Sequence, residues 1–440
     1  MTDNKAQNIL YIESILRHHM TLFGYEPIII PVIEEADIFL TRAGDTIIDR
    51  LFTFERFGHQ LALRPEFTAS VARHYVQARH TTVKRWQYSG IVFEDYADDH
   101  TLRFEKQSVG GELIGQSGAV ADAEIIAMAV QGVEKLGISN YRLIIGHVGL
   151  QIQLLSQFGL DSRTERVLLA QRETLRHNGL EAAWENVKQI LSFSDKSSTT
   201  NAQHDDTQTQ EMLDVLLDST KYGATMGGRS RHDIAQRLLA KHERSSEEKQ
   251  IRAALEFLAE WAQISASTSD SESTLSAFVQ DEQSSSILKQ FTEMLDLLTV
   301  CGVDTSKVVI QADLAKNWEY YTGVVFGIDI GNDDFIASGG RYDSLVGLFD
   351  SKKSVPAVGF AYFVDTLADT VSIERTANNV LRIYSEDVAL AIELANTLRT
   401  HDISAVLTNT HNADVLVNPE FIQYANNRYE TIDALVEDLR

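Results

Sequence analysis

The residues best suited to binding chemistry lie in two short glycine-containing segments of this 440-residue chain. Residues 320–326 read Tyr-Tyr-Thr-Gly-Val-Val-Phe, and residues 339–343 read Gly-Gly-Arg-Tyr-Asp. Both have the composition of β-strands interrupted by glycine, and we expect the two strands to be neighbours. Glycine permits close approach to the backbone, and tyrosine hydroxyls donate or accept hydrogen bonds. The pattern predicts a pocket for a small, flat, polar ligand.

Two acidic residues are candidates for the same pocket. Glu66 and Thr68 follow Pro65 at an expected strand-to-helix turn, where the alternative is that Thr68 only caps the helix. Glu112 lies between glycine and apolar residues in an expected strand. An inward carboxylate there needs a partner, because burying an unpaired charge is costly. A ligand imidazole would supply one, so we expect Glu66, Thr68 and Glu112 to contact the ligand.

The aromatic and basic candidates have alternatives in ordinary packing. Tyr321 and Tyr342 could be core residues with satisfied hydroxyls, but their glycine neighbours favour ligand contact. In a regular strand Tyr320 would point to the opposite face, so we assign it to packing. Arg341 could bind the ligand or form an ion pair with Asp343.

The first 150 residues, which carry several of these candidates, alternate strands with single helices. We expect helices over 8–23, 69–79 and 121–136, a proline-bounded strand over 26–32, a hairpin over 52–63, and strands over 87–93 and 103–115. This order predicts an α+β fold, an antiparallel sheet backed by helices. His147, between apolar and glycine residues, is expected to be a satisfied core histidine.

The rest of the chain divides into three parts. Residues 151–304 are helical and polar, and predict an inserted helical module with helices over 211–219, 232–242 and 247–262. Polar stretches at 192–210 and 264–286 are expected to be mobile surface connections. Strands resume at 308 and continue through 361. Residues 379–440 read strand–helix–strand–strand–helix, a small α/β segment.

Composition limits the classes of function. A hydrophobic content of 44% and a charged content of 23% are those of a soluble globular protein, and the length predicts two or three domains. The net charge of −24 does not favour tRNA binding, because proteins that hold nucleic acids normally present a basic face, although a local basic patch can occur in an acidic chain.

The location and cofactor content follow from what the sequence lacks. Cys301 is the single cysteine, which excludes an internal disulfide and favours a reducing compartment. No apolar run approaches the roughly 20 residues that span a bilayer, and residues 1–20 lack a signal-peptide core. We expect a cytoplasmic protein with no metal site, no cofactor and no membrane association.

Several ordered motifs resemble those of class II histidyl-tRNA synthetases. Residues 23–34 resemble motif 1, the dimer-forming helix and strand, and 63–68 (Leu-Arg-Pro-Glu-Phe-Thr) resemble the loop that holds the α-amino group. Residues 110–115 (Gly-Gly-Glu-Leu-Ile-Gly) resemble the strand whose glutamate reads the imidazole. With the two tyrosine segments, these motifs imply a histidine pocket in a class II fold formed by residues 1–150 and 305–372. The resemblance also implies a homodimer through motif 1.

The catalytic cations of that family are changed in this chain. Glu94 follows Phe93 where the synthetases have the arginine that holds the ATP α-phosphate. Lys316 replaces the arginine before the Tyr-Tyr pair, and Thr366 replaces the arginine of motif 3. Adenylation depends on positioned positive charge, so we expect no amino-acid activation and no catalytic residues.

The C-terminal segment completes the resemblance. Residues 381–416 resemble the start of the synthetase anticodon-binding domain and 429–440 its final helix, without the central part. A kept histidine pocket, a lost ATP clamp and a shortened anticodon-binding domain resemble the regulatory subunit of short-form ATP phosphoribosyltransferase. Residues 227–239 resemble that family's helical insertion more weakly. Membership implies a separate catalytic subunit, a hetero-octamer and feedback inhibition by L-histidine. The alternatives are a divergent histidyl-tRNA synthetase and a stand-alone histidine sensor.

One departure falls inside the predicted pocket. The family has a glutamine four residues before the imidazole-reading glutamate, and this chain has Ser108 there, with Gln107 beside it. Either the α-amino contact is weakened or a one-residue bulge turns Gln107 toward the ligand. The candidate histidine-binding residues are Glu66, Thr68, Gln107, Glu112, Tyr321, Arg341 and Tyr342.

Overall fold

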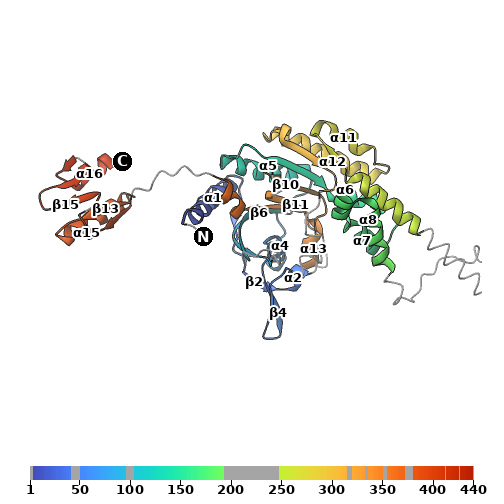
Figure 1. Cartoon of the computed structure of the whole chain (residues 1–440), viewed down its shortest axis with the longest axis horizontal. Coiled ribbons are helices and arrows are strands. Elements are labelled where there is room, and N and C mark those ends of the chain that lie inside the picture. Colours follow the sequence, from blue (N-terminus) through green and yellow to red (C-terminus); the bar gives the residue numbers. More distant parts are fainter. Residues whose placement is uncertain are drawn as a thin grey trace, which may run out of the picture. The chain divides into compact units, whose positions relative to one another are not determined.

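The chain forms two compact units, Met1–Val371 and Ser372–Arg440, which are described separately. The computed structural model (Figure 1) describes residues 3–40, 50–95, 104–192, 247–314, 320–331, 335–349, 354–371, 380–411, 413–425 and 427–439. Within these ranges, no helix combines the length and the apolar character needed to cross a bilayer.

The larger unit is built on a nine-stranded sheet with the order β1-β5-β6-β12-β11-β10-β7-β9-β8. In that order the strands are Glu26–Pro27, Lys84–Phe93, Glu105–Ile114, Ala357–Phe363, Phe335–Arg341, Val324–Asp329, Arg142–His147, Val308–Gln311 and Ser265–Ala266. The pairing is antiparallel except for β1–β5 and β7–β9. The expected α+β fold is confirmed, and so is the expected pairing of β10 with β11, in which Val325 opposes Gly340.

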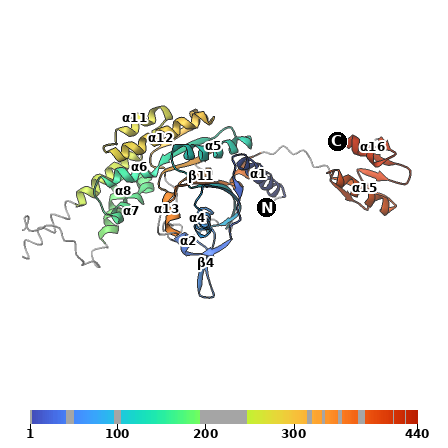
Figure 2. The same cartoon turned by 180° about the vertical axis from the view of Figure 1, so that it is seen from behind.

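Helices cover both faces of this sheet (Figures 1 and 2). One face packs against α1 (Asp3–Leu22), α5 (Ala119–Lys135), α12 (Glu282–Val300) and α14 (Val364–Thr370). The other packs against α2 (Asp37–Leu40), α4 (Thr68–Gln77) and α13 (Asp343–Phe349). Successive strand residues point to opposite faces, so Val109 and Leu113 of β6 join the first core and Ile114 joins the second. Glu112 shares the face of Ile114, toward α4 and α13.

A three-stranded sheet, β2-β4-β3, precedes α4 in the chain. The predicted hairpin is present as β3 (Thr53–Arg56) and β4 (His59–Leu63). The predicted single strand over 26–32 is wrong, because β1 ends at Pro27 and β2 begins only at Ile33. Pro27 and Pro31 carry no N–H group to continue a ladder, so the segment leaves one sheet and enters the other.

The region after β7 is helical, as expected. It contains α6 (Val148–Ser156), α7 (Ser162–Leu169), α8 (Arg172–Ser192) and a helix over 247–261, which confirms the helix predicted there. The helices predicted over 211–219 and 232–242, the connection over 192–210 beyond the end of α8, and the fragment 227–239 lie outside the described residues.

The expected connection over residues 264–286 is wrong. It contains β8, the helix α11 (Thr268–Ser276) and the first turn of α12. Some of the small polar residues act at helix ends: Ser267 caps α11, and Asp281 forms a capping box with Ser284 at the start of α12. Ile264 and Leu275 are buried in the main core, so this polar stretch still contributes apolar residues to it.

The smaller unit is a five-stranded sheet with the order β14-β13-β15-β16-β17. Its elements in chain order are β13 (Leu381–Tyr384), α15 (Val388–Thr400), β14 (Ala405–Leu407), β15 (Val415–Val417), β16 (Ile422–Tyr424), β17 (Asn427–Tyr429) and α16 (Ile432–Leu439). The predicted order missed the hairpin of β16 and β17. Three-residue strands are too short to show an alternating pattern.

Candidate functional site

Glu112 lies in the middle of β6 and is 0% exposed. Trp86 of β5 and Gly359 of β12 oppose it on the two neighbouring strands. A Cβ atom at position 359 would overlap Glu112 Oε2, and one at Gly110 would lie 2.5 Å from Tyr88 Oη. Glycine at these two positions therefore provides the space in which the carboxyl group and the tyrosine ring meet.

Three hydroxyl groups surround the Glu112 carboxyl. Tyr342 Oη donates to Oε2 at 2.6 Å, and Thr68 Oγ1 and Tyr88 Oη donate to Oε1 at 2.7 and 3.3 Å. We call these three residues the hydroxyl cage. Burial raises the pKa of Glu112 to about 8, although the hydroxyl groups favour the ionised form. The nearby Glu66 raises this pKa further.

Glu66 lies in the turn that begins α4. Its carboxyl accepts hydrogen bonds from the backbone N–H groups of Thr68 and Ala69, the latter at 2.8 Å. Burial raises the pKa of Glu66 to about 7, and these N–H donors oppose the rise. Glu66, not the Thr68 hydroxyl, therefore satisfies the helix N-terminus. Thr68 connects the two carboxyl groups, since its N–H bonds Glu66 and its hydroxyl bonds Glu112.

Three tyrosines pack together beside this pair. The ring centroids of Tyr320 lie 4.8 Å from Tyr321 and 5.9 Å from Tyr342. Burial raises the pKa of all three, so their hydroxyls are neutral near pH 7. We expected Tyr320 to point to the opposite face because we assumed that it lies in a regular strand. That assumption was wrong, because β10 begins at Val324 and residues 320–323 do not form a strand. Strand alternation does not apply there, and Tyr320 is buried against both other tyrosines.

Tyr88 belongs to the site but was not predicted. It lies on β5 opposite Gly110, two residues along from Trp86, which opposes Glu112. Both rings are buried in the core that faces α4. The alternation of aromatic residues along β5 was a signal that could have placed Tyr88 on this face.

An aromatic and cationic stack supports Tyr88. Its ring lies 4.2 Å from that of Phe67 at an interplanar angle of 9°, and Arg64 Cζ lies 4.0 Å from the Phe67 centroid. The Arg64 guanidinium donates to Ile30 O at 2.7 Å and to Ile91 O at 2.9 Å. These bonds fix Arg64, so the stack holds one member of the hydroxyl cage in place.

Arg341 does not join the cluster. Its guanidinium forms ion pairs with Asp122 at 2.7 Å and with Asp343 at 3.0 Å. Burial raises the pKa of Asp122 to about 6, and Arg341 opposes the rise. The structure thus places Arg341 in the ion pair that was the alternative to ligand binding.

Gln107 also lies elsewhere. The register of β6 against β5 is continuous from Glu105 to Ile114, so the bulge that would turn Gln107 inward is absent there. Five residues separate Gln107 from Glu112, and an odd separation puts their side chains on opposite faces. Gln107 Nε2 instead lies 3.3 Å from Ser89 Oγ and 3.4 Å from Glu13 Oε2. The prediction of an inward Gln107 is corrected on this register.

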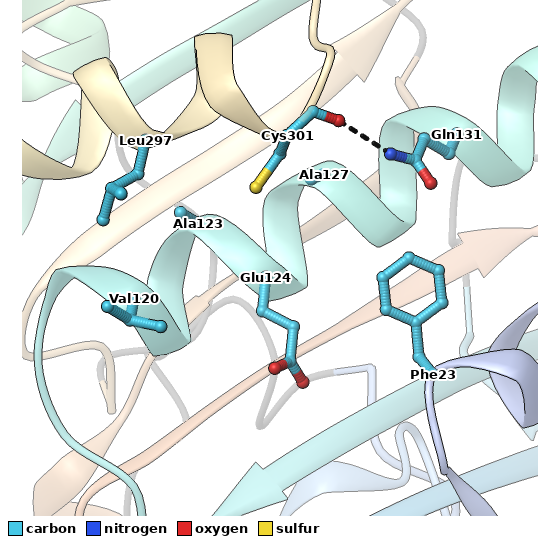
Figure 3. A pocket seen from close by; sticks show the side chains of 8 residues that line it. All are labelled: Phe23, Val120, Ala123, Glu124, Ala127, Gln131, Leu297 and Cys301. Atoms are coloured by element: carbon cyan, nitrogen blue, oxygen red, sulfur yellow. Dashed lines mark hydrogen bonds between the residues drawn. The ribbon is translucent and has the colours of Figure 1, made fainter.

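A surface groove lies on the other face of the sheet (Figure 3). It has a volume of about 400 Å³, and its lining residues are Phe23, Val120, Ala123, Glu124, Ala127, Gln131, Leu297 and Cys301. Two of its polar side chains already have partners: Arg85 and Tyr25 hold Glu124, and Gln131 Nε2 donates to Cys301 O at 3.0 Å. The buried carboxyl pair is therefore the stronger candidate for ligand binding.

Comparison with known proteins identifies the family to which the chain belongs. A family model described as histidyl-tRNA synthetase matches residues 1–367. The chain belongs to the histidyl-tRNA synthetase family. The chain is similar to proteins of two kinds, histidine–tRNA ligases and ATP phosphoribosyltransferase regulatory subunits. The histidine–tRNA ligase of Saccharolobus islandicus is 26% identical over 92% of this chain and 82% of its own length. The ATP phosphoribosyltransferase regulatory subunit of Brucella anthropi is 27% identical over 80% of this chain and 95% of its own length.

Solved structures share the class II synthetase fold of this family member. An ATP phosphoribosyltransferase regulatory subunit/histidyl-tRNA synthetase from Bacillus halodurans C aligns with a TM-score of 0.65 at 21% identity, covering 98% of this chain and 92% of that one. The histidyl-tRNA synthetase of Nostoc sp. PCC 7120 aligns with a TM-score of 0.67 at 15% identity, covering 99% and 95%. At these identities the alignments establish the fold alone.

The positions expected to lack synthetase cations can be placed in part. Glu94, just after β5, forms an ion pair with Arg50 at 3.2 Å. Thr366 lies on α14, and Lys316 lies outside the described residues. His147 caps α6, with Nδ1 accepting from Leu150 N at 2.9 Å, and burial lowers its pKa to about 4. The hydrogen bond of His147 agrees with the prediction of a satisfied histidine.

Proposed function

We propose that this chain is a non-catalytic regulatory subunit of a short-form ATP phosphoribosyltransferase and that it binds L-histidine as a feedback inhibitor. The observation that carries the proposal is the buried Glu112 carboxyl inside the hydroxyl cage, with Glu66 bonded to the same threonine. Two carboxyl groups in an aromatic site suit a ligand with two nitrogen donors, as histidine has in its imidazole and ammonium groups.

Each part of the site has a role in this proposal. Glu112 accepts the imidazole N–H, since it is the deeper of the two carboxyl groups. Glu66, at the beginning of α4, accepts from the α-ammonium. Tyr320, Tyr321 and Tyr342 enclose the ring of the ligand, because neutral tyrosines combine a flat apolar body with a polar hydroxyl. Gln107 and Arg341 have no direct role.

Two positions support a subunit that does not activate amino acids. Glu94 places negative charge just after β5, where the synthetases hold the ATP α-phosphate with an arginine, and its partner is Arg50. Thr366 on α14 offers no charge for a triphosphate. Phosphoryl chemistry needs positioned cations, so these residues are poorly suited to it.

The proposal includes an assembly. Residues 1–150 and 305–372 would form the histidine-binding domain, 151–304 a helical insertion, and 379–440 a shortened anticodon-binding-like domain. A homodimer would form through residues 23–34, and four such chains would join four catalytic subunits in a hetero-octamer. Inhibition requires histidine to favour the inhibited assembly, typically by about 1–3 kcal/mol. The setting would be the cytoplasm and the first step of histidine biosynthesis.

Reconstitution tests the proposal. The purified chain is mixed with a short-form catalytic subunit, ATP and phosphoribosyl pyrophosphate, and product formation and co-elution are measured. We expect the chains to co-elute, activity to rise, and histidine to reduce it. Absence of both co-elution and stimulation would contradict the regulatory role.

The 92% coverage of this chain by a histidine–tRNA ligase favours a second candidate, a divergent synthetase. Histidine-dependent exchange of pyrophosphate into ATP distinguishes the two. We expect no exchange above background, and clear exchange would support the synthetase.

A further inference from the structure

The partners of Glu112 differ in kind from those of Glu66. Thr68, Tyr88 and Tyr342 approach Glu112 through hydroxyl groups, whereas Glu66 is bonded by two backbone N–H groups. An N–H group can only donate, so the Glu66 site favours an ionised carboxylate. A hydroxyl can either donate or accept. By rotating one O–H bond, the hydroxyl cage can hold Glu112 as a carboxylate or as a carboxylic acid.

Burial favours the protonated form of Glu112 before a ligand binds. Glu112 is 0% exposed, and it forms no ion pair with a lysine, arginine or histidine that the structure describes. An isolated buried charge is expensive, so a group in this position normally becomes neutral. Among the described residues, the titratable groups that interact with it are Glu66 before α4, Tyr88 on β5, Tyr342 after β11, Tyr320 and Tyr321 before β10, and Tyr25 after α1. None of these supplies positive charge.

We propose that, before a ligand binds, the hydroxyl cage holds Glu112 protonated at neutral pH and that the arriving ligand removes this proton. The O–H bond of the carboxylic acid breaks, and the proton passes to the unprotonated imidazole nitrogen or to water. The carboxylate that remains accepts the imidazole N–H. This inference rests on the proposed histidine site, because histidine supplies the donor that replaces the proton.

The exchange explains why the cage contains hydroxyl groups. A cationic partner in the protein would keep Glu112 ionised and would compete with the ligand for it. The cage gives the carboxyl group of Glu112 hydrogen-bond partners in both protonation states. The cage therefore needs no protein cation to avoid an unpaired buried charge before the ligand binds.

Infrared difference spectroscopy tests the inference through the C=O stretch of a protonated carboxylic acid. At pH 7 we expect the wild-type chain to show a carboxylic-acid absorption that is missing in Glu112→Gln and kept in Glu66→Gln. It should disappear as the pH rises through about 8 and, at pH 7, when 13C-labelled histidine is added. Asp122→Asn is the matched control: Asp122 is also buried but is paired with Arg341, so this variant should keep the absorption.

Identical wild-type and Glu112→Gln spectra at pH 7 would overturn the inference, as would an absorption that survives saturation with histidine. Calorimetric titration of wild type with histidine separates this failure from failure of the proposed function. Heat of binding without the absorption contradicts proton exchange alone. An absorption that titrates with pH in a chain that binds no histidine contradicts the histidine site.

Discussion

Two groups of carboxylates are contacted from the end of β11, and their partners differ. Arg341 is the last residue of the strand and forms ion pairs with Asp122 and Asp343. The next residue, Tyr342, points elsewhere and donates to Glu112. In the first group a guanidinium neutralises the charge. In the second the partners are neutral hydroxyl and N–H groups, and in the proposed function a cationic ligand supplies the opposite charge.

On the proposed function, this difference separates the structural carboxylates from those that bind the ligand. A buried carboxylate paired with arginine is complete within the protein, and removing one partner leaves the other charge exposed to an apolar environment. A buried carboxyl with only neutral partners keeps its capacity for an added donor. We therefore predict that substitutions of Glu112 and its partners mainly alter ligand affinity. Substitutions in the ion-paired group around Arg341 should mainly alter the free energy of unfolding.

The largest expected effect is on the ligand-binding side. Glu112→Gln should weaken histidine binding by about 1,000-fold, or about 4 kcal/mol, because it removes the charged partner of a buried donor. Isothermal titration calorimetry measures this. Glu94→Gln is the control and should bind like wild type. Retention of near wild-type affinity in Glu112→Gln would remove Glu112 from the site.

The structural group should respond in stability. Asp122→Ala leaves Arg341 with Asp343 alone and should lower the free energy of unfolding by about 3 kcal/mol. Urea denaturation of the variant and wild type gives this value, with histidine affinity measured on the folded variant. A loss of histidine affinity in Asp122→Ala as large as that in Glu112→Gln would contradict the division between structural and ligand-binding carboxylates.

The carboxyl pair should also make stability depend on pH. The pKa values of Glu112 and Glu66 are raised in the folded chain to about 8 and about 7, from an ordinary 4.5. The folded chain therefore holds protons that the unfolded chain releases, and their stabilising contribution is present below pH 4.5 and lost as the pH rises through 7 to 8. Between pH 5 and 8, Glu112→Gln should lose less stability than wild type, by on the order of 2 kcal/mol. Parallel urea melts across this range would show equal slopes if Glu112 is ionised throughout.

The smallest effect concerns the stack behind Tyr88. Phe67→Leu keeps an apolar residue but removes the ring between Tyr88 and Arg64, and should weaken histidine binding by about 5-fold, or about 1 kcal/mol. Phe57→Leu is the matched control, because Phe57 is 88% exposed at the tip of the β3–β4 hairpin. Equal affinities in the two variants would show that the stack does not position the cage.

The sequence predicted which residue types form the site better than it predicted which residues contact one another in the fold. Glu66, Thr68, Glu112 and Tyr342 were predicted from residue type beside proline and glycine, and the structure brings them together. Tyr88 was not predicted, because its contact with Glu112 arises from strand pairing that residue types alone do not specify.

The errors have equally physical causes. The inward position for Gln107 required a bulge, and nothing in the residue types of β6 fixes its register. Residues 264–286 were assigned to a loop from their composition, yet Ser267 and Asp281 use polar side chains to begin helices. Polar composition therefore failed to distinguish a helix N-terminus from a connection, since both favour the same residues.

The central claim is that histidine acts on this chain through Glu112 to inhibit a partner enzyme. The most direct test is the activity of the reconstituted phosphoribosyltransferase at increasing histidine concentration, with wild-type and Glu112→Gln subunits. The account predicts that both subunits stimulate the catalytic chain and that only the wild-type complex is inhibited by histidine. Equal inhibition of the two complexes would contradict it.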